Sequence, residues 1–134
     1  MTRLGDLRKG LKDRLATING LQPYATMPAN PQTPSAAVIP RSVTVPLSFD
    51  QDATYRFAIW VYVNSQDLTR AQTSIDEYLS TDGAKSIEAA IEADPSLGGV
   101  AQTAYVTGWA DYAQIVDIGD AKVLGCRIDV ECLA

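Results

Sequence analysis

The spacing of apolar residues predicts that the chain begins with an amphipathic helix. Large apolar residues recur three or four positions apart from Arg3 to Ile18, so they share one stripe of a helix, and the opposite face is mostly charged. The stripe consists of Leu4, Leu7, Leu11, Leu15 and Ile18. Asn19 and Gly20 tolerate the left-handed conformation that ends helices. The prolines that follow, up to Pro40, exclude further helix there.

A two-residue alternation then predicts strands. Ser35 to Ile39 and Ser42 to Val45 are short apolar pieces interrupted by Pro40, which we expect at a sheet edge or in irregular structure. Tyr55 to Val63 is the clearest strand and is apolar on both faces, as expected of a central strand. Either another subunit or the chain's own helix or arm covers Trp60 and Tyr62.

The second half combines both periods. Ser65 is a suitable N-cap for a helix from Gln66 to Leu79, and a shorter helix is expected from Ala84 to Ala93. Three strands follow, at Thr103 to Thr107, Tyr112 to Ile118 and Lys122 to Leu133, with Gly119 and Asp120 as a two-residue hairpin turn. The order predicts a single α+β domain over residues 1–134, with an antiparallel or mixed sheet and the N-terminal and two central helices on one face.

The composition removes several kinds of chemistry. The chain has no histidine, which excludes Ser-His-Asp and Cys-His catalysis, and it contains neither GxxxxGK[ST] nor GxGxxG. Cys126 and Cys132 lie six residues apart in one strand pattern, too far for a disulfide, so we expect two free buried thiols. No apolar run could span a bilayer, and we expect a cytosolic protein that is not an enzyme and holds no metal or cofactor.

Charge is distributed unevenly along the chain. The net charge is −5, which argues against tight, sequence-independent binding to nucleic acid. Residues 1–18 nevertheless carry +3. The basic helix either docks on an acidic partner or has a solvated charged face, and the second interpretation is favoured.

Two further segments are candidates for contacts. Tyr24 to Pro34 is rich in proline and poor in charge, so it is either an interface arm or a surface loop. Asp50 and Asp52 flank a polar turn but lack the further oxygen ligands and the glycine of a calcium loop, so a solvated turn is favoured over a cation site.

Since the chain shows no catalytic motif, the order of its segments and their amino-acid sequences remain as evidence. They include the helix from Leu4-Gly5-Asp6-Leu7-Arg8 to Leu15-Ala16-Thr17-Ile18, the segment Pro34-Ser35-Ala36-Ala37-Val38-Ile39-Pro40, the helix Asp67 to Leu79, the run from Ser86-Ile87-Glu88 to Leu97-Gly98-Gly99-Val100, and the closing strand through Val130-Glu131. In these segments, over nearly its whole length, the chain resembles the tail terminator proteins of long-tailed phages, particularly those that infect actinobacteria.

The resemblance implies a virion protein that assembles in the host cytoplasm as a ring, a hexamer, at the head-proximal end of the tail tube. It implies contacts with the tail tube protein and with the stopper or connector of the head, while genomic DNA passes through the lumen without specific binding. The residues expected at these contacts are Tyr24, Met27, Pro28, Pro31, Pro34, Asp50, Asp52, Trp60 and Tyr62.

Two alternatives remain open. A head-to-tail stopper or another connector subunit is also small and ring-forming, although the helix from Gln66 to Leu79 argues against such largely β proteins. The other alternative is a cytosolic binding module, or an enzyme subunit whose site a partner completes.

Overall fold

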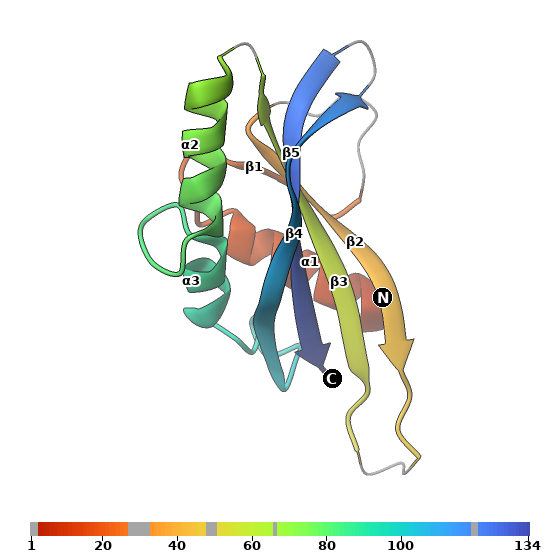
Figure 1. Ribbon diagram of the computed structural model, residues 1–134. Coiled ribbons are helices and arrows are strands. Elements are labelled where there is room, and N and C mark those ends of the chain that lie inside the picture. Colours follow the sequence, from red (N-terminus) through yellow and green to blue (C-terminus); the bar gives the residue numbers. More distant parts are fainter. Residues whose placement is uncertain (1–2, 27–32, 48–50, 66, 119–120) are drawn as a thin grey trace.

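The computed structural model describes the chain except for residues 1–2, 27–32, 48–50, 66 and 119–120 (Figure 1). Three helices and five strands follow one another along the described chain. In chain order they are α1 (Arg3–Leu15), β1 (Gln22–Tyr24), β2 (Ser35–Thr44), β3 (Thr54–Asn64), α2 (Leu68–Leu79), α3 (Ile87–Glu92), β4 (Thr103–Ile118) and β5 (Ala121–Leu133).

The strands form one mixed sheet in the order β1-β2-β3-β5-β4. β1 pairs with β2 in parallel, whereas the other three pairings are antiparallel. β3 is paired along its length by β5 on one side and by β2 on the other. The predicted α+β class and the central position of β3 are therefore confirmed.

The prediction of two broken pieces around Pro40 is wrong, because β2 is one strand. β1 covers only Ser35–Ala37 of β2, so from Val38 onward β2 is an edge strand, and an edge position tolerates the missing N–H of proline. The register against β3 shifts between Pro40 and Ser42, which absorbs the irregularity without ending the strand.

The prediction of separate strands at 103–107 and 112–118 is also wrong, because both belong to β4. Pairing with β5 continues across two register shifts, one between Val106 and Gly108 and one between Ala110 and Gln114. Asp111 and Ala113 have φ of 56° within the second shift, which marks a bulge rather than a break. The predicted turn at 119–120 lies outside the described residues, and Ile118 and Ala121 on either side of it are paired.

The helices α1 and α2 are shorter than the sequence predicts, α1 at its end and α2 at its start. α1 ends at Leu15 rather than Ile18, although Ile18 is buried with the rest of the predicted stripe. α2 begins at Leu68, and its N-cap is Asp67 instead of Ser65, since the Asp67 carboxylate accepts a hydrogen bond from the Arg70 N–H at 3.2 Å. The Ser65 hydroxyl instead donates to the Lys122 carbonyl at 2.9 Å.

α3 is shorter than the predicted helix from 84 to 93. It begins at Ile87 because the buried Ser86 hydroxyl accepts a hydrogen bond from the Ala89 N–H at 3.1 Å and so caps the first turn. α1 is attached to this helix by Arg14, whose Nε donates to the Ala90 carbonyl at 2.8 Å. At least one basic side chain of α1 therefore has a structural contact within the chain.

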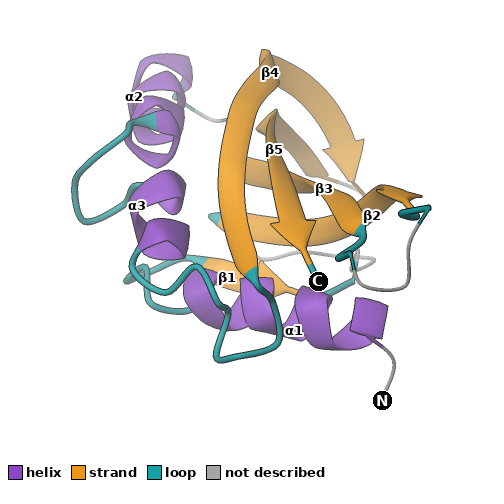
Figure 2. Cartoon of the chain, turned by 90° about the horizontal axis from the view of Figure 1, so that it is seen from below, coloured by secondary structure: helices purple, strands orange, loops and turns teal. Residues whose placement is uncertain are grey.

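All three helices pack on one face of the sheet (Figure 2). α1 lies against β1 and β2, α2 against β3 and β5, and α3 against β4 and α1. A single buried cluster joins the helices to alternate residues of the central strands, among them Phe57, Ile59 and Val61 of β3 and Cys126, Ile128 and Val130 of β5. α1 approaches the segment before β4 so closely that a Cβ at Gly10 would lie 2.8 Å from the Leu97 Cβ.

Candidate interaction surfaces

The sheet face opposite the helices carries a row of polar contacts across four strands. The Arg56 guanidinium of β3 lies 3.2 Å from the Glu131 carboxylate of β5 and donates to the Thr44 hydroxyl of β2 at 2.8 Å. From β4, the Tyr105 hydroxyl donates to Glu131 at 2.6 Å, a hydrogen bond that raises the pKa of this tyrosine. These side chains are partly exposed, so each pair contributes little stability on its own.

Arg127 of β5 extends the same row. Its Nε lies 3.1 Å from the Asp129 carboxylate, and its Nη1 lies 3.4 Å from the Asp111 carboxylate on β4. The Nε is buried and its contact with Asp129 lacks hydrogen-bond geometry, so the contact is ionic. Positive and negative side chains thus neutralise one another along this face, which leaves it polar without a strong net charge.

Trp60 and Tyr62 lie on this face, at the other end of β3. Their rings are stacked, with centroids 6.5 Å apart and planes inclined by 7°. A Cβ on Gly125 of β5 would lie 3.1 Å from the Tyr62 ring, so the glycine makes room for it. Tyr62 is 4% exposed in the single chain and Trp60 is half-buried. The chain itself therefore covers most of Tyr62, and a subunit contact at these residues stays a prediction.

The other predicted contact residues are separated in the structure. Tyr24 ends β1 and Pro34 precedes β2, both partly buried. Asp52 is exposed just before β3. Met27, Pro28, Pro31 and Asp50 lie outside the described residues. The structure thus does not gather the described members into one site, and their interface role stays a prediction.

The edge strand β4 exposes large apolar side chains. We define the β4 surface as Trp109, Tyr112 and Ile115, whose exposed fractions are 54%, 37% and 64%. The Trp109 and Tyr112 rings are in contact, with centroids 5.8 Å apart, and the Tyr112 hydroxyl donates to the Asp76 carboxylate of α2. Exposed apolar groups on a long edge strand are typical of a surface that another chain covers.

A second apolar surface lies at the opposite sheet edge, where β2 leaves the sheet. We define the hairpin surface as Val43, Val45 and Leu47, with exposed fractions of 47%, 73% and 107%. Val43 pairs with Tyr55 near the start of β3, whereas Ile115 aligns with Leu124 and Val63 near its end. The two surfaces therefore lie at opposite edges and opposite ends of the sheet, and they do not overlap.

Charged residues lie near both surfaces. Arg41 is exposed on β2, and Arg3 lines a hollow with Val45 and Leu47. Near the β4 surface Asp76 and Asp117 are exposed, but the exposed Lys122 is the cross-strand partner of Asp117, and Arg127 pairs with Asp111. The charge near the β4 surface is thus largely neutralised within the chain, and the two surfaces match in apolar character.

Sequence reasoning missed both surfaces. Val43 and Ile115 have the same alternation as buried strand residues, so periodicity alone cannot tell them from the core. Whether such a residue is exposed depends on whether its strand lies at a free edge of the sheet and whether a helix covers it. Both are decided by the long-range order of the strands. The one available signal was the aromatic pair Trp109 and Tyr112 after Gly108, with Trp109 between two predicted strands and Tyr112 at the start of the second.

No metal-binding group is present in the described part of the chain. Within these ranges, no three residues among Cys, Asp and Glu come together in a way that could hold an ion. None of the described helices is long and apolar enough to cross a membrane.

Both cysteines lie in the core rather than at a reactive site. Cys126 and Cys132 are free, fully buried and on the helix-facing side of β5, as the alternation predicts. Burial raises the pKa of each thiol to about 12. A thiol without access to its thiolate form is a poor nucleophile and a poor metal ligand.

Replacing both cysteines with valine should leave the fold intact and make it less sensitive to alkali. The unfolded thiols lose their protons above about pH 8.5–9, while the folded ones keep them to about pH 12. The thiols therefore leave the free energy of unfolding unchanged below about pH 9. Above that pH they lower it by about 1.4 kcal/mol per pH unit per thiol. We expect urea midpoints at pH 7 and pH 10 to fall less in the double variant than in the natural chain. An equal fall in both proteins would contradict the assignment.

No protein-family model matches the chain, and no curated protein matches it in sequence.

Proposed function

We propose that the chain is the tail terminator of a long-tailed phage, a subunit that closes into a ring of six on the head-proximal end of the tail tube. The ring ends tube polymerisation and offers its other side to the head connector. The observation that carries the proposal is the pair of exposed apolar surfaces at opposite sheet edges. The resemblance of the sequence segments to tail terminator proteins supports the same role.

Two different surfaces on one chain favour a ring over a simple dimer. A twofold dimer uses one surface twice, whereas a ring joins one surface of each copy to a different surface of the next. The hairpin surface and the β4 surface are both apolar and exposed, so each can cover the other in a neighbouring copy. In such a ring, the two neighbours of each copy cover both of its exposed edges.

The role requires no catalytic group, because a ring acts by occupying the end of the tube. An acidic chain also suits a passage for DNA. Each copy carries a net charge of −5, and a wall without excess positive charge gives the genome no strong adhesion. The ion pairs on the sheet face opposite the helices leave little net charge there, so this face would attract DNA phosphates only weakly.

The mass of the assembly tests the proposal. We expect native mass spectrometry, or light scattering of the protein alone or with tail tubes, to give a closed complex of six 14.4 kDa chains. Electron microscopy should place that complex on one end of the tube. A protein that stays monomeric and leaves both tube ends bare would contradict the proposal.

A second candidate is a binding module, because a cavity of about 370 Å³ lies beside α2. This size falls in the range of small-ligand sites. A monomer that binds a ligand there and ignores tail tubes would favour this candidate.

A further inference from the structure

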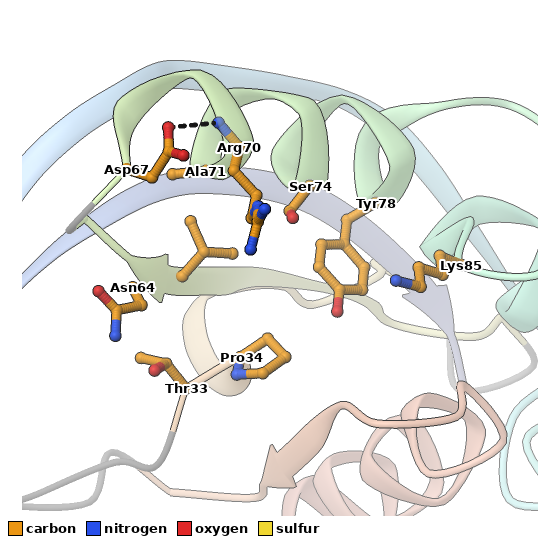
Figure 3. Close-up of a pocket in the computed structure, with 10 residues that line it drawn as sticks. Thr33, Pro34, Asn64, Asp67, Arg70, Ala71, Ser74, Tyr78 and Lys85 are labelled. Atoms are coloured by element: carbon orange, nitrogen blue, oxygen red, sulfur yellow. Dashed lines mark hydrogen bonds between the residues drawn. The ribbon is translucent and has the colours of Figure 1, made fainter.

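A cavity opens between α2, the end of β3 and the chain that enters β2 (Figure 3). Its volume is about 370 Å³. Apolar side chains form part of its wall, namely Pro34, Val63 and Ala71. The remaining wall is polar and includes Arg70, Ser74, Tyr78 and Lys85. The cavity is therefore suited to a ligand with a polar end and an apolar body.

Tyr78 brings an unused hydroxyl to this cavity. The side chain is 2% exposed and belongs to the core, but its hydroxyl points into the open space (Figure 3). No hydrogen bond joins this hydroxyl to another residue in the described ranges. Burial, with the nearby Glu77 carboxylate, raises the pKa of Tyr78, so the group stays protonated and able to donate. Because it faces the cavity, this hydroxyl can donate a hydrogen bond to an acceptor on a ligand.

Two cationic side chains line the same cavity as that hydroxyl. The Arg70 guanidinium points into the cavity, and the Lys85 amino group points toward Tyr78 (Figure 3). Lys85 lies 3.6 Å from Glu77, but both side chains are about half exposed, so a ligand can compete with this weak pair. The Asp67 carboxylate on the rim already accepts the Arg70 N–H as the cap of α2. With Arg70, Lys85 and Asp67 together, the lining has a net charge of +1.

We propose that this cavity binds a carboxylate on a short apolar stem. The carboxylate accepts hydrogen bonds from Tyr78 and Ser74 and pairs with Arg70 and Lys85, while the stem lies against Pro34, Val63 and Ala71. A single negative charge balances the net charge of +1 on the lining. A free small acid and a glutamate side chain of a partner protein share this chemistry. The site does not depend on the proposed terminator role.

Titration of the ¹⁵N-labelled full chain with butyrate, followed by NMR, tests the proposal. We expect saturable shifts at the amides of Ala71, Tyr78 and Lys85, and about tenfold weaker binding to the Tyr78→Phe variant, which keeps the ring and loses the donor. Arg70→Gln should weaken binding similarly. The matched control is Lys9→Gln, which removes a positive charge from the exposed side of α1 and should bind as the natural chain does.

The choice of probe separates the two sources and exposes a false site. Tighter binding of N-acetylglutamate amide than of butyrate indicates a glutamate of a partner, and the reverse order indicates a free acid; either order supports a carboxylate site. Equal binding to the Tyr78→Phe and natural chains overturns the proposal. Shifts that phosphate or chloride reproduces at equal concentration overturn it as well, because they report general screening.

Discussion

A lysine in place of Ile115 should abolish ring formation while the subunit stays folded. Ile115 is 64% exposed in the single chain, so the new charge stays in water when the subunit is alone. In the proposed ring it would face the apolar hairpin surface of the next copy, where burying an unpaired charge costs several kcal/mol at each contact. We expect native mass spectrometry to give a monomer at concentrations where the natural chain gives the closed complex.

A second variant shows whether the two surfaces meet each other. Val45→Lys blocks the hairpin surface and should also give a monomer. Each variant keeps one intact surface, so an equimolar mixture should yield a dimer and no ring. Thr73→Lys adds the same charge on the side of α2 that faces away from the sheet and should assemble normally. A mixture that stays monomeric, or single variants that still close, would contradict the pairing of these surfaces.

The sequence predicts best those strands whose apolar residues are regularly spaced along their whole length. In β5, apolar residues on the helix-facing side alternate with mostly polar ones, whereas β3 is apolar on both faces over most of its length; one face of each meets the helices. β1 has only three residues, one of them Pro23, and depends on parallel pairing with β2. No local pattern could indicate it, because its hydrogen bonds come from a segment that begins at Ser35.

Local signals also compete with one another, and tertiary contacts decide between them. Ser65 and Asp67 are both good N-caps, and the structure uses Asp67 because Ser65 is bound to the Lys122 carbonyl. Gly108 and Asp111 suggest a loop, yet pairing with β5 carries β4 through both of them. Patterns near a residue therefore predict that an element exists more reliably than they predict where it ends.

The candidate surfaces were harder to predict than the fold. Tyr62 and Ile115 both occupy strand positions of apolar character, but the first is covered by its own chain and the second is exposed. The difference arises because β3 is central and β4 is the last strand of the sheet. Only the strand order reveals it, and the sequence does not contain that order in any local pattern.

Loss of the protein should remove the control of tail length. A terminator occupies the growing end of the tube, so tubes should elongate beyond the normal length when it is absent, and filled heads should remain unjoined. A stopper acts at the head, so its loss should give free tails of normal length and heads that leak DNA. The two roles therefore predict opposite tail-length distributions.

Tail length in particles made without this protein is accordingly the most direct measurement. The proposal predicts that a nonsense mutation in the gene of a phage encoding this chain gives, in electron microscopy of the lysate, a broad distribution of overlong tubes beside separate full heads. Supplying the natural chain should restore one sharp length, and supplying the Ile115→Lys variant should not. Free tails of normal length would contradict the terminator role and favour the stopper, and normal infectious particles would contradict both.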